Sequence, residues 1–141
     1  MRANEWGKIQ PENVSSWINF DRTNPTWEYK AGDASMASKQ AEGVAYLWNL
    51  LALHNVALLA DEVGMGKTYQ ALGVAALLWK MKPDAKVLVM APNKDICAHW
   101  RREYSTFVRR HFREVDHCVK NSADHGPVQS IREYWRLDDL A

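Results

Sequence analysis

Apolar side chains recur with helical spacing in three stretches of the chain. In the first stretch, Val44, Leu47, Trp48 and Leu51 follow one another at intervals of three, one and three residues. This spacing gathers the apolar side chains on one face of a helix. The pattern predicts three helices, over residues 37–53, 67–82 and 95–113.

Two shorter runs between these helices are uniformly apolar. They read NVALLA over residues 55–60 and KVLVMA over residues 86–91. A short run without polar alternation is typical of a strand that is buried on both faces. Alternation of such strands with helices predicts the α/β class, with a parallel sheet and helices on its faces.

Residues 1–35 differ in character from the rest. They contain Trp6, Trp17 and Trp27, three of the seven tryptophans, and a stretch rich in turn-forming residues. We expect an irregular, tryptophan-rich N-terminal extension over residues 1–35, whose tryptophans pack against the core. The organised part of the chain is predicted to be residues 36–141.

The charge, the cysteine content and the lengths of the apolar stretches limit the kinds of protein that this sequence can be. The formal net charge of the 141 residues is +1, so any attraction to nucleic acid must be local. Cys97 and Cys118 are too few for a disulfide framework. The longest apolar stretch, residues 47–60, is shorter than the about 20 residues that span a bilayer. We expect a cytoplasmic protein with no membrane partner, associated with the nucleoid if the source is bacterial.

The run LLADEVGMGKT, residues 58–68, joins the first apolar run to the second predicted helix. Gly64 and Gly66 allow a tight bend, and the backbone N–H groups of such a bend, with the helix N-terminus, attract anions. Lys67 adds a positive charge, and Thr68 offers a hydroxyl to Mg²⁺. The run predicts a variant phosphate-binding loop, with Asp61 where the usual pattern has glycine. The alternative is an ordinary turn between strand and helix.

Three blocks of sequence together resemble one family. LLADEVGMGKT resembles motif I of the Swi/Snf-type DNA translocases, a branch of the superfamily-two helicases. KQAEGVAYLWNLL resembles the segment that precedes this motif, and KVLVMAPNKDICAHWRREY resembles motif Ia. The blocks occur in the family's order and cover roughly residues 36–104. The resemblance implies a RecA-like lobe that binds ATP and Mg²⁺, in a motor that moves along duplex DNA.

The resemblance also assigns roles to single residues. Gln40 stands at the position of the family's adenine-recognising glutamine, and an amide can both donate to and accept from a purine edge. Lys67 is the expected catalytic residue, and Thr68 the expected Mg²⁺ ligand. The expected ATP-binding residues are Gln40, Asp61, Glu62, Val63, Gly64, Met65, Gly66, Lys67 and Thr68. Without the resemblance, Gln40 would be read as a solvated residue near a helix start.

One family feature is missing from the sequence. No Asp-Glu-x-His motif follows an apolar run, although ATP hydrolysis by this family needs such an acidic pair. We therefore expect residues 36–141 to be the beginning of the first RecA-like lobe, inactive without the remainder of the motor and its second lobe. The alternative is a truncated module that binds nucleotide or another protein and does not hydrolyse ATP. An unrelated phosphate-loop NTPase would not explain the neighbouring blocks.

The third predicted helix has an apolar side and a basic side. The basic side carries Arg101, Arg102, Arg109, Arg110 and Arg113. We expect the first three to contact the phosphates of duplex DNA, since each neutralised phosphate releases counterions. The alternative is a solvated charged face. Cysteines and histidines invite a zinc site but fit no usual ligand spacing; they are Cys97, His99, His111, His117, Cys118 and His125.

Overall fold

The computed structural model describes residues 7–60, 64, 66–82 and 84–111. The described residues form four helices: α1 (Pro11–Trp17), α2 (Met36–His54), α3 (Lys67–Met81) and α4 (Lys94–Arg110). The predicted helices over residues 37–53 and 67–82 are confirmed to within one residue at each end. The third predicted helix is confirmed as α4, whose last residue is Arg110.

Local sequence explains where the long helices begin and end. The Ser35 side chain accepts a hydrogen bond from the backbone N–H of Ser38, and the Asn93 side chain accepts one from Ile96. These are N-caps, which satisfy N–H groups that have no partner inside the helix. At the other end of α2, Asn55 has a left-handed backbone with φ of 59°. Asparagine tolerates this conformation, so it ends the helix with little strain.

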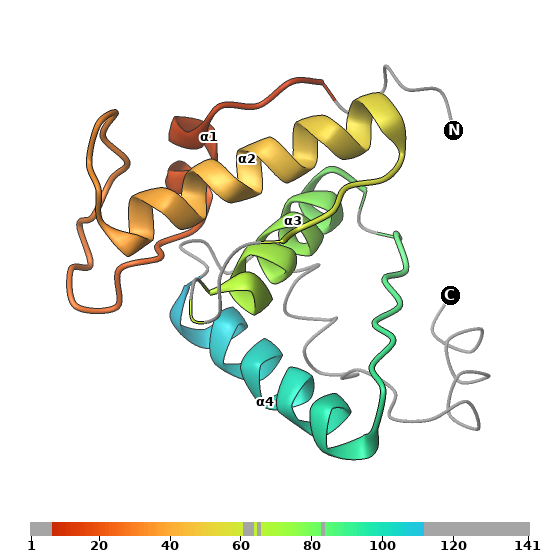
Figure 1. Cartoon of the computed structure of the whole chain (residues 1–141). Coiled ribbons are helices and arrows are strands. Elements are labelled where there is room, and N and C mark those ends of the chain that lie inside the picture. Colours follow the sequence, from red (N-terminus) through yellow and green to blue (C-terminus); the bar gives the residue numbers. More distant parts are fainter. Residues whose placement is uncertain (1–6, 61–63, 65, 83, 112–141) are drawn as a thin grey trace.

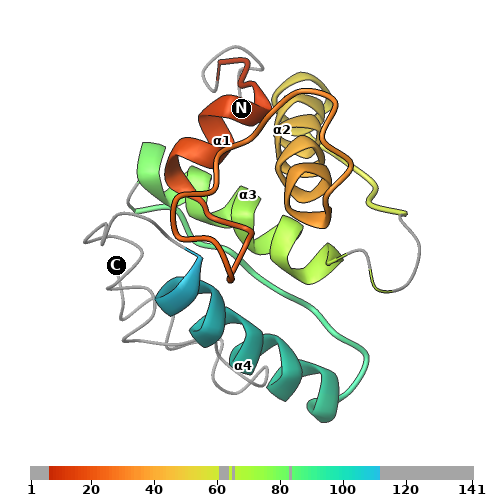
Figure 2. The same cartoon turned by 90° about the vertical axis from the view of Figure 1, so that its left-hand side faces the viewer.

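Helix α3 is central to the packing. It lies between α2 and α4 and contacts both of them, while α1 lies beside α2 (Figures 1 and 2). None of the helices among the described residues has the length and hydropathy that crossing a membrane requires. The following apolar residues form the buried core: Val14, Ile18, Phe20, Trp27, Ala37, Ala41, Val44, Ala45, Trp48, Leu72, Ala76, Leu77, Tyr104 and Phe107.

Two glycines allow α2 and α3 to approach closely. A Cβ atom on Gly73 of α3 would lie 2.9 Å from Cγ2 of Val44 in α2. A Cβ atom on Gly43 of α2 would overlap the side chain of Gln70 in α3. At each of these glycines, a side chain of one helix thus packs directly on the backbone of the other. This close crossing fixes the position of α3 relative to α2.

The predicted parallel sheet is wrong, because the described residues contain no β-strand. The segments 55–60 and 86–91 have no regular secondary structure and follow α2 and α3 as extended chain (Figure 1). Their side chains are largely exposed: Val56 to 69%, Leu58 to 82% and Met90 to 86%. An apolar run meets only one condition for a buried strand, since its backbone groups also need partners in neighbouring strands. The two runs do not pair with one another, so the residues that the structure describes do not form the expected RecA-like α/β architecture.

The N-terminal segment is part of the core. Its helix α1, which the sequence did not predict, starts where Asn13 accepts a hydrogen bond from the N–H of Gln10. The side chains of Ile18, Phe20 and Trp27 in this segment are buried. The burial of Trp27 agrees with the expectation that tryptophans of the segment pack against the core. The boundary between residues 1–35 and 36–141 remains a prediction.

Candidate functional site

The glycine-rich loop ends where α3 begins. Gly64 and Gly66 have φ values of 87° and 70°, in the left-handed region that favours glycine. Gly66 is the N-cap of α3, so no side chain at the cap accepts from the first-turn N–H groups. Such a helix start is the usual setting for a bound anion. Four further loop residues of the predicted site lie outside the described residues: Asp61, Glu62, Val63 and Met65.

Gln40 of α2 lies against this helix start. A Cβ atom on Gly66 would overlap Nε2 of Gln40 and would lie 3.0 Å from its Cδ. Gln40 is only 5% exposed, so it is not the solvated residue of the alternative interpretation. The fold therefore brings together two of the predicted site residues, which come from different helices.

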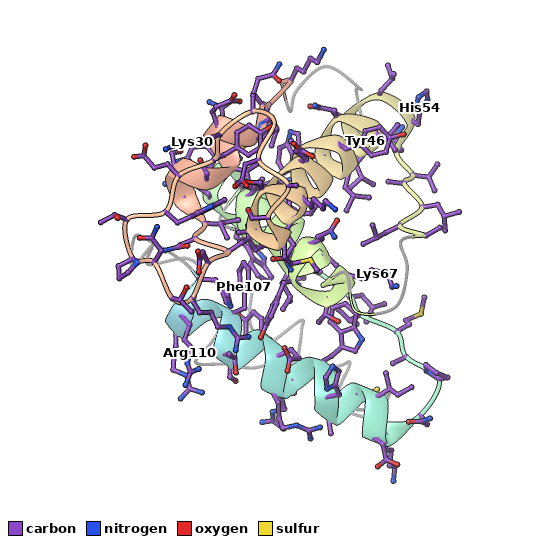
Figure 3. All side chains as sticks on the ribbon, turned by 60° about the vertical axis from the view of Figure 1, so that its left-hand side comes forward. Lys30, Tyr46, His54, Lys67, Phe107 and Arg110 are labelled. Carbon is purple, nitrogen blue, oxygen red and sulfur yellow. The ribbon has the colours of Figure 1, made fainter. Side chains whose placement is uncertain are left out.

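Lys67 and Thr68 are the first two residues of α3, and both are half-buried. Figure 3 shows Lys67 at the end of α3 that is nearest to the glycine-rich loop. A lysine and a hydroxyl in the first turn of one helix place a positive charge and a metal-ligand group beside the helix N-terminus. The described residues thus combine a glycine turn, a lysine, a hydroxyl and an amide in one place.

Tyr69 is the next residue of α3, and the sequence analysis did not single it out. Its ring stacks on the ring of Phe107. The centre of the Tyr69 ring also lies 4.7 Å from the centre of the His111 ring, and the two ring planes are tilted by 46°. Its hydroxyl accepts a hydrogen bond from Nη2 of Arg22. Burial, followed by a hydrogen bond to Glu103, raises the pKa of Tyr69 above its ordinary value. Tyr69 therefore ties the first turn of α3 to α4 and to the N-terminal segment.

His111 caps the C-terminal end of α4 and is only 2% exposed. Its Nε2 accepts a hydrogen bond from Nε of Arg22 at 3.2 Å, and its Nδ1 lies 2.7 Å from the carbonyl oxygen of Asn19. Both contacts are satisfied only when the ring is neutral and the proton is on Nδ1, which donates to Asn19. Burial first, and then the positive charges of Arg22 and Arg110, lowers the pKa of His111.

Helix α4 has the two sides that its sequence predicts. Tyr104 and Phe107 are buried against α3, and Figure 3 shows Phe107 pointing inward and Arg110 pointing away from it. Arg109 donates from Nε to the backbone oxygen of Ser105. Four arginines on the outer side are exposed: Arg101, Arg102, Arg109 and Arg110. Arg113 lies outside the described residues.

No group of three or more metal-ligating side chains occurs in the part of the chain that the structure describes. Of the candidates for a zinc site, Cys97 and His99 lie near the start of α4, and His111 lies beyond its other end. His111 has both ring nitrogens engaged by protein groups. The other three candidates, His117, Cys118 and His125, lie outside the described residues.

Comparison with known proteins gives one consistent family. The SNF2-related domain matches residues 39–136. Protein CHROMATIN REMODELING 24 of Arabidopsis thaliana is 37% identical over 67 residues, which are 48% of this chain and 6% of that protein. The ATP-dependent helicase fft3 of Schizosaccharomyces pombe is 29% identical over 109 residues, with 68% of this chain and 12% of the relative covered.

The chromatin remodeling factor mit1 of the same yeast is 31% identical over 120 residues. That match covers 82% of this chain and 8% of the relative. The chain thus spans only 6% to 12% of the length of these curated relatives. No solved structure matches the chain.

Proposed function

We propose, because the chain belongs to the SNF2-related domain family, that it binds ATP between Gln40 and the turn at residues 64–68. Among its relatives are proteins named as an ATP-dependent helicase and as chromatin remodelling factors. In the longer protein, we infer that hydrolysis of this ATP drives movement along duplex DNA. The chain contributes the contacts to adenine and to the phosphates.

The contact between Gln40 and Gly66 carries this proposal. A nucleotide site must hold a base and a phosphate chain at a fixed separation, and the two groups come from helices that cross in the fold. Gln40 is buried on α2, and Gly66 is the N-cap of α3 in a conformation that glycine adopts readily. An amide beside a phosphate-sized turn suits adenine, because adenine presents one donor and one acceptor on the same edge.

The first turn of α3 fits the triphosphate and its metal. The left-handed backbone at Gly64 and Gly66 is the kind of turn whose N–H groups point toward an anion. Lys67 supplies a positive charge for the distal phosphates, and the Thr68 hydroxyl would be a ligand of Mg²⁺. The remaining loop positions of the proposed site are Asp61, Glu62, Val63 and Met65.

The outer side of α4 supports the DNA contact of the longer protein. Arg101, Arg102 and Arg109 are exposed along one helix, opposite the apolar residues that pack on α3. Arginine binds phosphate oxygens through a planar fork of donors. We assign these three arginines to the phosphates of duplex DNA.

Nucleotide binding by three variants tests the proposal. Lys67→Ala removes a charged contact to phosphate, so the affinity for MgATP and MgGTP should fall alike, by about tenfold or more. Gln40→Ala removes one or two neutral hydrogen bonds, so the affinity for ATP should fall by about tenfold and that for GTP should hardly change. Isothermal titration calorimetry measures both affinities for each variant.

Lys30→Ala is the control, since Lys30 is exposed on the N-terminal segment and away from Lys67 (Figure 3). Its affinities should equal those of the wild type. Wild-type binding by Lys67→Ala would overturn the phosphate site. An unchanged ratio of ATP to GTP affinity in Gln40→Ala would overturn the adenine contact, even if both affinities fell.

A further inference from the structure

The guanidinium of Arg22 joins two helices that carry proposed functional residues. Its Nε donates to Nε2 of His111, just beyond α4, and its Nη2 donates to the hydroxyl of Tyr69 in α3. The guanidinium carbon also lies 5.3 Å from the centre of the Tyr69 ring. One side chain of the N-terminal segment therefore contacts α3 and the residue that caps α4, and it lies outside the part of the chain that the family match covers.

The segment around Arg22 is attached to the C-terminal end of α4 by hydrogen bonds. The backbone N–H of Asn19 donates to the backbone oxygen of His111 at 2.7 Å. The carbonyl oxygen of Asn19 accepts from Nδ1 of the same histidine, also at 2.7 Å. His111 is hydrogen-bonded through its backbone and through both ring nitrogens, so its ring holds the guanidinium of Arg22 in one position. Its reach toward Tyr69 is therefore defined by the fold.

Tyr69 connects Arg22 to the first turn of α3. It directly follows Thr68, and its hydroxyl accepts the hydrogen bond from Nη2 of Arg22. Its ring stacks on Phe107 of α4. The N-cap of α3 is a glycine, so the first turn has no side-chain cap of its own to hold its direction. Tertiary contacts of the first turn then decide how Lys67 and Thr68 are oriented.

We propose that Arg22 is a positioning residue that, through Tyr69, holds the first turn of α3 in the orientation that binds phosphates. This inference rests on the proposed nucleotide site at residues 64–68. Arg22 does not touch the nucleotide; it fixes the helix turn that does. The N-terminal segment accordingly contributes to nucleotide binding by holding the first turn of α3 in place.

The test measures three ligands against four proteins: wild type, Arg22→Ala, Tyr69→Phe and the double variant. The ligands are MgATP, inorganic triphosphate and adenosine. Each single variant removes the hydrogen bond between the two side chains, so the affinities for MgATP and for triphosphate should fall by about twofold to tenfold. The double variant should be no weaker than the weaker single variant, because both changes break the same contact. Adenosine, which has no phosphate, should bind all four proteins alike.

Lys30→Ala separates positioning from charge, since it removes a positive charge from the same segment and should leave all three affinities unchanged. Three results would overturn the inference: wild-type affinity for MgATP in Arg22→Ala, affinity decreases that add in the double variant, or an equal decrease for adenosine. Tyr69→Phe keeps the ring that packs on Phe107, so it answers the question even where Arg22→Ala is poorly folded. If Lys67→Ala also bound triphosphate normally, the nucleotide site itself would be wrong, and the failure would not be specific to Arg22.

Discussion

The side-chain amide of Gln40 packs directly on the backbone of Gly66, so that a Cβ atom at position 66 would overlap Nε2 of Gln40. The corresponding point on Gly64 has no described atom within 4 Å. Both glycines have a left-handed backbone. The two positions therefore share one conformational demand and differ in the space around them, which makes them a matched pair.

Gly66→Ala should destabilise the protein more than Gly64→Ala. A left-handed backbone costs each alanine about 1–2 kcal/mol. Only the alanine at position 66 must also displace the amide end of Gln40, and because that side chain is flexible the added cost should be smaller than the about 1–3 kcal/mol of overpacking a rigid core. Urea unfolding of both variants measures the difference. Removing the obstacle in Gln40→Ala should abolish the extra cost, so equal destabilisation in the two glycine variants, or an extra cost that persists with Gln40→Ala, would contradict the packing.

The helices could be predicted because their signals are local. The spacing of Val44, Leu47 and Trp48 defines the buried face of α2, and all three are buried. Ser35 and Asn93 are good N-cap residues at the ends of the apolar patterns, and both act as caps. Each of these features depends on residues within one or two turns of each other, so a pattern in the sequence is sufficient.

The sheet could not be predicted in this way, because a strand depends on a partner elsewhere in the chain. The apolar runs at 55–60 and 86–91 are suited to strands but remain unpaired within the described structure. The contacts of Arg22 with Tyr69 and His111 were missed for a related reason. They join three distant segments, and no spacing rule links an arginine in a turn-rich segment to a tyrosine on α3 and a histidine that caps α4. Gln40 was found only through the family resemblance.

Stability should fall as the pH drops below about 6.5, the ordinary pKa of histidine. The folded protein lowers the pKa of His111, so between that lowered value and about 6.5 the unfolded chain binds a proton that the folded chain does not. Stability then decreases as the pH falls through this window and levels off below it. Asp21 and Asp33 also have lowered pKa values, but their contribution is lost only below 3.8. Thermal unfolding across pH 4 to 8 measures the effect.

His111→Asn should flatten the stability profile in this window, because asparagine does not titrate. His99→Gln is the matched control, since His99 is an exposed histidine of the helix that His111 caps, and its profile should follow the wild type. A profile in His111→Asn that is as steep as that of the wild type would mean that another group causes the pH dependence. The lowered pKa of His111 would then not be the cause of the loss of stability in this window.

Arg101, Arg102 and Arg109 should set the salt dependence of DNA binding in the full-length protein. Replacing all three by alanine removes up to three phosphate contacts, and the slope of log K against log salt should become shallower by about 0.9 for each phosphate that is no longer neutralised. The affinity for ATP in the absence of DNA should not change, because the three side chains are exposed on the outer side of α4 and belong to none of the proposed ATP contacts. Fluorescence anisotropy with duplex DNA at several salt concentrations gives the slope.

The matched control removes the same number of positive charges from other exposed positions, in a triple alanine variant of Lys8, Lys30 and Lys82. If net charge alone attracts the DNA, both triple variants should bind it with the same reduced slope. If α4 contacts the phosphates, only the arginine variant should change the slope, because counterion release counts the phosphates that are actually neutralised. A slope that equals that of the wild type in the arginine variant would leave these residues as a solvated face of α4. The proposed DNA contact would then have to involve other residues.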